Sequence, residues 1–407
     1  MRTCGVESER VPLDIERLRR ETAGCWDVIH FDNAGAAFMA DSVYQTVMDH
    51  LGRERRVGGY RAADEASADL ERVYASAARL LGCDPDEIAV VENATRAWDM
   101  AFYAIPLGEG DRILTGRAEY CSNYIAMTQV CARTGATIEV IPDDDMGQVS
   151  IEMLERTLDE RVKLIALTHV PMTGGLVNPA AAVGRVARAA GVPFLLDACQ
   201  SVGQLPVDVR AIGCDLLTAT SRKYLRGPRG VGFLYARREL AERLEPPFLD
   251  VHAIDWEHWT PPGPYTVRTG ARRFENWEAN YAGKLGMGMA IDYALALGIQ
   301  ETYALVQALA ANLRARLTEI PGVRVQDNGT ERCGIVSFTV ADRDPLEIAH
   351  ALAARRVNVS GARGLCTPLD LPARGLTQGI VRASVHYYNT ADEVERFCSA
   401  LASMVAP

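Results

Sequence analysis

Seven short apolar runs between residues 88 and 234 alternate with amphipathic segments, most of which are long enough to form a helix. A strand that is apolar along its whole length is buried on both faces, as in a parallel sheet whose connecting helices cover both sides. The pattern therefore predicts an α/β fold with a mostly parallel, seven-stranded sheet and helices on both faces. The predicted strands are 88–91, 112–115, 137–141, 164–167, 194–196, 216–218 and 232–234.

Helices are predicted where apolar residues recur at helical spacing, at 41–53, 66–81 and 180–190. A longer helical pattern covers 289–317, with Gly298 as its only glycine. After it the pattern changes, which predicts a smaller α+β domain at the C-terminal end of the chain. Its predicted elements are a strand at 334–340, a helix at 345–355, a strand at 357–360 and a strand–helix pair within 380–404.

The length of the chain agrees with two hydrophobic cores, since 407 residues exceed the roughly 250–300 residues at which a single core stops growing. We predict a large domain at 25–280 and a small domain formed by 1–24 together with 281–407. Within the small domain, glycine and proline are dense at 361–379 and no periodicity remains, so this segment is predicted to be a mobile loop.

Composition excludes several classes of protein. The net charge is −10 and no long basic run occurs, so we expect no nucleic-acid or membrane partner and a small molecule as ligand. The ten cysteines form no C-x-x-C pair, which argues against a zinc module or a disulfide scaffold, and we expect no metal site. The first ten residues are polar and no stretch of ~18 apolar residues occurs, from which a cytoplasmic location is expected.

Lys223 and Asp197 are the residues that most clearly indicate chemistry. Asp197 ends the predicted strand that begins at Phe194, and Lys223 follows in a run that ends in glycines. A lysine that forms an imine with a carbonyl cofactor needs a fixed, partly desolvated position, and pyridoxal 5'-phosphate (PLP) needs a carboxylate to keep its pyridine nitrogen protonated. A lone lysine before glycines is more often a solvated loop residue, and a lone aspartate at this position could cap a helix. The combination predicts a PLP site.

Taken in chain order, the motifs resemble those of the class V aminotransferase and cysteine desulfurase family, which are PLP enzymes of fold type I. The resemblance implies that Ala94 and Thr95, at a helix start after the strand ending at Val91, hold the cofactor phosphate with backbone N–H groups. The alternative is a plain helix cap by Asn93 or Thr95. Around the lysine, the resemblance assigns Thr220 and Arg222 to the same phosphate.

The resemblance also assigns the faces and edges of the cofactor ring. Tyr120 stands where desulfurases carry a histidine that stacks on the ring, with a buried structural tyrosine as the alternative. Met172 stands where many relatives carry an asparagine near the phenolic oxygen, and methionine cannot serve it. Thr173 or Gln200 is therefore expected there. His169 is expected to be a buried imidazole with satisfied hydrogen bonds, with a group that supports a neighbouring site residue as the alternative.

For the substrate, the resemblance implies that Arg382 binds an α-carboxylate, with an ordinary surface ion pair as the alternative. It also implies a homodimer, in which Trp277 and Glu278 replace the pair that reaches the neighbouring subunit's phosphate; interface packing is the other interpretation of Trp277. Cys366 lies roughly where desulfurases hold their persulfide-forming cysteine, but a bystander thiol is the preferred interpretation.

The resemblance to epimerase-like and cysteine-conjugate lyase branches predicts a C–S lyase that performs α,β-elimination on an S-substituted cysteine or a related α-amino acid. In this prediction Lys223 is the base, Asp197 stabilises the developing carbanion, and Tyr120 contacts the reacting centre. The alternatives are an aminotransferase or epimerase of a specialised amino acid, a cysteine desulfurase that uses Cys366, and a non-enzymatic PLP-binding regulatory protein.

Overall fold

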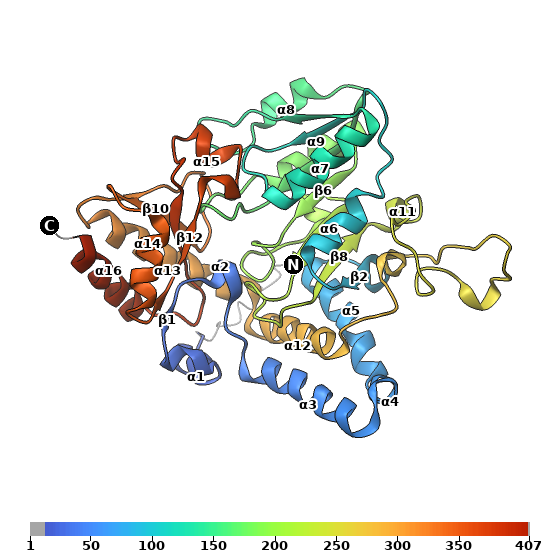
Figure 1. Ribbon diagram of the computed structural model, residues 1–407, viewed down its shortest axis with the longest axis horizontal. Coiled ribbons are helices and arrows are strands. Elements are labelled where there is room, and N and C mark those ends of the chain that lie inside the picture. Colours follow the sequence, from blue (N-terminus) through green and yellow to red (C-terminus); the bar gives the residue numbers. More distant parts are fainter. Residues whose placement is uncertain (1–12, 406–407) are drawn as a thin grey trace, which may run out of the picture.

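The computed structural model describes residues 13–405, and its centre is a seven-stranded sheet (Figure 1). All seven predicted strands are present, each within two residues of its predicted ends. The order across the sheet is β2-β8-β7-β6-β5-β3-β4; β8 runs antiparallel to both of its neighbours, β2 and β7, and the other neighbouring pairs are parallel. The strands are β2 (Ile88–Val91), β3 (Arg112–Thr115), β4 (Thr137–Val140), β5 (Val162–Thr168), β6 (Phe194–Asp197), β7 (Leu216–Thr220) and β8 (Gly232–Ala236).

Both faces of this sheet are buried, as the unbroken apolar runs predict. In β6, Phe194 and Leu196 belong to one hydrophobic cluster and Leu195 to another on the opposite face. The first face is covered by α5 (Ser67–Leu81), α8 (Ile151–Thr157), α9 (Ala180–Ala190), α10 (Val209–Ile212) and α12 (Tyr281–Leu297). The second is covered by α6 (Ala94–Phe102), α7 (Cys121–Thr134) and α11 (Arg238–Ala241). The predicted α/β architecture is confirmed.

The long helical pattern after the sheet is interrupted at Gly298. It forms α12 and α13 (Ile299–Thr318), which meet at an angle of 81°. Gly298 has φ +85°, a conformation that L side chains rarely adopt, so it ends one helix and begins the next. Among the helices within residues 13–405, none alone is long and apolar enough to cross a membrane, and α12 and α13 meet that criterion only as this bent pair.

A second core lies beside the large sheet, around the four-stranded sheet β12-β13-β10-β9. The predicted strand at 357–360 is divided, because β11 pairs with β1 while β12 pairs with β13. Leu18 from the start of the described chain packs into this core, and residues 1–12 of the predicted small domain lie outside the described residues. The elements are β1 (Ile29–His30), β9 (Val323–Val325), β10 (Ile335–Val340), β11 (Val357–Asn358), β12 (Ser360–Ala362), β13 (Ile380–Ser384), α1 (Ile15–Arg20), α14 (Pro345–Ala353) and α16 (Ala391–Val405).

The segment 361–379 contains regular structure that its sequence did not predict. It includes the 3-10 turn η5 (Gly364–Cys366) and the short helix α15 (Asp370–Ala373). Leu371 is fully buried and packs with Ala362 and Ile380, so burial of a few apolar side chains, rather than periodicity, shapes this segment.

The remaining helices lie in the N-terminal part of the chain. They are α2 (Asn33–Ala36), α3 (Asp41–Val57) and α4 (Gly59–Glu65). In Figure 1, α2 lies at the centre of the molecule, between the two sheets, while α3 and α4 form the lower edge. A long loop between α11 and α12 projects on the opposite side from α16.

Candidate active site

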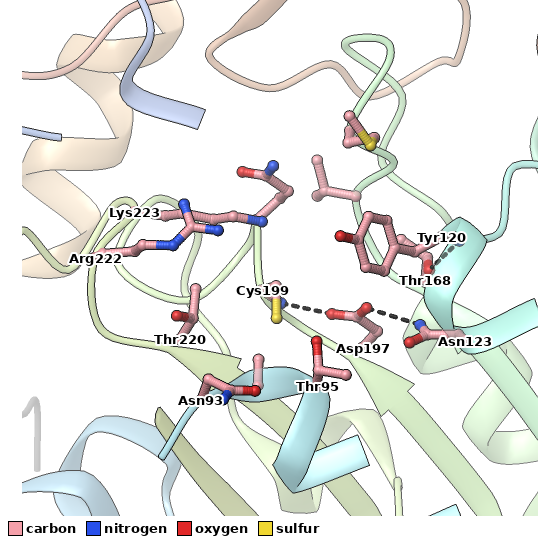
Figure 2. A pocket seen from close by; sticks show the side chains of 14 residues that line it. Asn93, Thr95, Tyr120, Asn123, Thr168, Asp197, Cys199, Thr220, Arg222 and Lys223 are labelled. Carbon is pink, nitrogen blue, oxygen red and sulfur yellow. Dashed lines mark hydrogen bonds between the residues drawn. The ribbon is translucent and has the colours of Figure 1, made fainter. Parts of the chain in front are cut away.

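A cavity of about 480 Å³ opens at the carboxyl ends of β5, β6 and β7. Parallel sheets present the ends of their strands and the starts of the following helices at this edge, which is where such folds bind ligands. Every residue predicted to bind the cofactor lines this cavity except Thr173 (Figure 2). The full lining is Asn93, Ala94, Thr95, Tyr120, Asn123, Thr168, Val170, Met172, Asp197, Cys199, Gln200, Thr220, Arg222 and Lys223.

Asp197 closes β6 and is held by two donors. Its Oδ1 accepts from the backbone N–H of Cys199 at 2.9 Å, and its Oδ2 accepts from Asn123 Nδ2 at 2.9 Å (Figure 2). A buried carboxylate is stable only with such partners. Asn123 was not predicted as a site residue, although it lies in the same segment as Tyr120, because its partner is 74 positions away in the sequence.

Glu119 is a second buried carboxyl group that supports the first. The same Nδ2 of Asn123 donates to Glu119 Oε1 at 2.8 Å, so one amide bridges two carboxyl groups. Thr168 donates to Glu119 through both its backbone N–H and its hydroxyl. Burial raises the pKa of Glu119 to about 7, helped by the charge of Asp197 and opposed by these hydrogen bonds. Glu119 was likewise not predicted from the sequence.

Lys223 lies in the loop after β7, where glycines allow close packing. A side-chain carbon on Gly227 would lie 1.8 Å from the Ser221 hydroxyl, so only glycine lets the loop fold back on itself here. Burial lowers the pKa of Lys223. The nearby groups Cys199 and Asp197 raise this pKa in part, and the positive charges of Arg222 and Arg382 lower it further. A lowered pKa increases the share of neutral amine, the form that acts as nucleophile and base.

The start of α6 provides an anion cradle at the floor of the cavity. Asn93 caps the helix by accepting from the backbone N–H of Arg96, so the predicted alternative of a helix cap is realised by Asn93. Ala94 and Thr95 occupy the first turn, where N–H groups have no partner inside the helix. Gly232 of β8 passes directly beneath, and a side-chain carbon there would lie 3.0 Å from the backbone nitrogen of Ala94.

Aromatic and thiol groups form further parts of the wall. Tyr120, the N-cap residue of α7, directs its ring into the cavity in Figure 2, and burial raises the pKa of its hydroxyl.

Cys199 lies between Asp197 and Lys223 and was not predicted as a site residue. Burial raises the pKa of Cys199 well above its ordinary value, so its thiol is protonated at neutral pH.

Two of the predicted cofactor residues contact α2. The Arg222 guanidinium donates to the backbone carbonyl of Gly35, and Gln200 Nε2 donates to the carbonyl of Ala34 at 3.0 Å. Gln200 Oε1 is buried and has no hydrogen-bond partner in the described part of the chain. An unpaired buried amide oxygen facing a cavity is costly unless a ligand completes its hydrogen bonds.

The other predicted residues lie outside the cavity wall. Thr173 is buried, with its hydroxyl 3.4 Å from that of Thr367, so of the two residues expected at the phenolic oxygen only Gln200 faces the cavity. Arg382 lies behind the wall and donates to Asp32 and to the carbonyl of Met172. Its ion pair with Asp32 is buried on the arginine side and so differs from the ordinary surface pair given as the alternative, and binding of a substrate carboxylate by Arg382 stays a prediction.

Three further predictions concern residues that do not line the cavity. Trp277 and Glu278 are exposed, and whether they reach a neighbouring subunit stays a prediction. Cys366 is half-buried and packs against the small cluster around Leu371. His169 is buried, but the expectation of satisfied hydrogen bonds is wrong for Nδ1, which has no partner among the described residues.

The residues around the cavity fit PLP. The donors at the start of α6, the close approach of Gly232 and the Arg222 side chain match a phosphate group, while Asp197 matches a protonated pyridine nitrogen. Gln200 supplies an unpaired polar atom for the remaining edge of the ring.

Comparison with known proteins agrees with this interpretation. The chain matches the family described as aminotransferase class-V over residues 29–397. It is 32% identical to a probable cysteine desulfurase of Xylella fastidiosa, across 97% of this chain and 94% of that protein. Among solved structures, a cysteine desulfurase from Thermococcus onnurineus aligns with a TM-score of 0.88 and 26% identity over 98% of this chain and 99% of that one. A cystine C–S lyase in complex with its product cysteine persulfide has the same fold, with a TM-score of 0.85 and 22% identity over 95% of this chain and 100% of that one.

The matched segment includes both predicted key residues, Asp197 and Lys223, and almost the whole described chain. A non-enzymatic role is therefore set aside. The protein belongs to the class-V aminotransferase family and is a PLP-dependent enzyme that acts on an amino acid.

Proposed function

We propose that the protein is a C–S lyase that performs α,β-elimination on an S-substituted cysteine or a closely related α-amino acid. The observation that supports this chemistry best is that Lys223 and Asp197 line one cavity. The described lining of this cavity includes no residue of 361–379, the segment that contains Cys366. In the proposed reaction the α-proton is removed, the C–S bond breaks, and the thiolate leaves with the bonding electron pair. The resulting enamine hydrolyses to pyruvate and ammonia.

When bound, PLP supplies an electron sink for the bond that is broken at the α-carbon. Ala94, Thr95, Thr220 and Arg222 are proposed to hold its phosphate. Asp197 is proposed to retain a proton on its pyridine nitrogen.

The protein groups then divide the remaining work. The Lys223 amine, whose pKa is lowered by burial, takes the α-proton. The Tyr120 ring points into the cavity, where it would stack on the cofactor and limit access of water. Asn123 holds the Asp197 carboxylate in place through its 2.9 Å hydrogen bond.

The distinction from a desulfurase depends on the thiols near the site. A persulfide-forming cysteine must be accessible and ionised. Cys366 packs against Ala362, Leu371 and Ile380, and the pKa of Cys199 is raised by burial. Packing limits access to the Cys366 sulfur, and the raised pKa of Cys199 disfavours its thiolate. Both features support elimination without sulfur transfer to the enzyme.

A cysteine desulfurase is the second candidate, because the curated relatives at 30–32% identity carry that name. An aminotransferase or epimerase of a specialised amino acid is the third. In a desulfurase, Cys366→Ala should abolish sulfur release to an added thiol while leaving the cofactor spectrum unchanged. In a lyase, the same variant should keep its full rate of pyruvate formation.

The decisive experiment treats purified holoenzyme with a panel of S-substituted cysteines and measures pyruvate, with Lys223→Ala as the control. A lyase releases pyruvate without an added keto acid, and the variant releases none. Accumulation of the pyridoxamine form without pyruvate would replace the proposal with transamination. Racemisation of the substrate without either product would replace it with epimerisation.

A homodimer is proposed as the working unit. The loop between α11 and α12 exposes large aromatic side chains that are each more than one-third accessible: Phe248, Trp256, Trp259, Tyr265 and Trp277. Large aromatic side chains gathered on a projecting loop are typical of subunit interfaces. Light scattering should give twice the chain mass, and Trp256→Ser combined with Trp259→Ser should shift the protein toward monomer.

A further inference from the structure

Arg382 has an incomplete set of hydrogen-bond partners. It lies on β13, and its side chain is 5% exposed. Its Nη1 donates to the carbonyl of Met172 at 3.0 Å, and its Nη2 donates to Asp32 Oδ1 at 2.9 Å. Its Nε is buried and has no partner among the described residues. Because Nε and Nη2 form one edge of the guanidinium group, Asp32 satisfies only half of that edge.

Arg382 lies next to the cavity that contains Lys223. Met172, the acceptor of its Nη1, is a wall residue of that cavity, and the charge of Arg382 reaches the lysine. Asp32 directly precedes α2, the segment whose carbonyl groups accept from Gln200 and Arg222. The side chain of Asp32 is 32% exposed, so it can leave the arginine for water at a smaller cost than the arginine could leave its pocket.

A carboxylate that is held by both Nε and Nη2 would satisfy the edge that Asp32 satisfies only in part. We propose that Asp32 is a specificity-determining residue, which competes with the substrate carboxylate for Arg382. This inference rests on the proposed function and on the prediction from the family resemblance that Arg382 binds the α-carboxylate of the substrate. Small amino acids then bind weakly because they must displace Asp32 without compensation. A substrate with a larger side chain offsets that cost through its own contacts.

The test uses L-alanine and L-alaninamide as probes, because they differ only in whether a carboxylate is present. Their binding to holoenzyme is measured by titration of the cofactor absorption, which reports occupancy rather than turnover. In Asp32→Asn the competing charge is gone, and we expect L-alanine to bind about fivefold more tightly, as an ion pair with one partly exposed partner implies. Binding of L-alaninamide should change less than about twofold, because it makes no use of the arginine edge.

Asp292→Asn is the matched control. Asp292 is a 28% exposed partner of Arg79 and lies on α12, away from the cavity. Its replacement should leave both titrations unchanged. Thermal unfolding of each variant shows that the comparison is made between folded proteins.

The outcomes separate the two proposals. If Asp32→Asn responds to L-alanine no better than wild type, or less well, the inference is refuted and Asp32 instead positions the arginine. An equal gain for both probes also refutes it, because the effect would then not depend on the carboxylate. If wild type gives no spectral response to either probe or to any S-substituted cysteine, the proposed function fails, and the inference fails with it.

Discussion

Replacement of Asn123 by alanine is expected to disturb both the stability and the cofactor site. Asn123 Nδ2 donates to Glu119 at 2.8 Å and to Asp197 at 2.9 Å, and all three side chains are buried. Hydrogen bonds to charged groups contribute about 1.5–3 kcal/mol each, so the loss of both costs about 3–6 kcal/mol of unfolding free energy. The two carboxyl groups would also lose the amide that separates them.

Asn178→Ala is the matched control for this change. Asn178 is equally buried, but its amide bonds the carbonyl of Thr168 and the N–H of Val149, which are neutral groups. Such bonds contribute about 0.5–1.5 kcal/mol each, so its replacement should cost about 2 kcal/mol less than that of Asn123. The loss of packed atoms is the same in both variants and cancels in the comparison.

Urea unfolding followed by circular dichroism measures the two free energies, and absorption of the holoenzyme reports the cofactor. Asn123→Ala should shift the cofactor absorption, because Asp197 loses one of its two donors. The pKa of Glu119, about 7, lies above that of an ordinary carboxyl group, so protonated Glu119 stabilises the folded state at low pH. This stabilisation is lost as the pH rises through 7. The Asn123→Ala deficit should therefore be larger at about pH 8.5 than at about pH 6. Equal losses in both variants, with an unchanged spectrum, would refute this account of the bridge.

Three further predictions concern single residues. Burial lowers the pKa of His169 to about 4, so the neutral imidazole stabilises the fold fully above its ordinary pKa, and this stability is lost as the pH falls. Between pH 7 and pH 5, the unfolding free energy of His169→Gln should therefore fall by about 2 kcal/mol less than that of wild type. Urea unfolding measures both values, and identical pH profiles would contradict this prediction. In Gly232→Ala, the new carbon would lie 2.6 Å from a backbone oxygen and 3.0 Å from the first-turn N–H group of α6. PLP affinity should therefore fall by about tenfold or more. Gly59→Ala is the control, because a side-chain carbon at Gly59 meets only open space and should leave PLP affinity unchanged. Tyr120→Ala should weaken PLP binding by about tenfold through loss of the stacked ring, while Tyr120→Phe should retain it; equal effects would show that the hydroxyl, not the ring, matters.

The strands of the large sheet could be predicted because their signal is local. A strand such as β6 is covered on both faces, so its burial is written in its own run of apolar residues. Asp197 and Lys223 could be predicted because they occur together. An acid at the end of an apolar strand is costly unless it has a partner, and a lysine that follows it supplies the other half of a PLP site.

Elements that depend on distant partners could not be predicted in the same way. The helical pattern at 289–317 continues through Gly298, but packing of α12 on the large sheet and of α13 on the second core requires a bend there. The run at 357–360 is one extended segment by its sequence and two strands by its pairing.

The same division separates the parts of the active site. Residue types and their order along the chain indicated the cofactor, the lysine and the carboxylate, because these depend on chemistry that each residue carries by itself. The bridge through Asn123 and the pairing of Arg382 with Asp32, 350 positions earlier, arise only when separate strands and helices come together. A hydrogen bond is directional and extends over about 3 Å, so its partner is decided by the packing of the whole molecule and not by any local pattern.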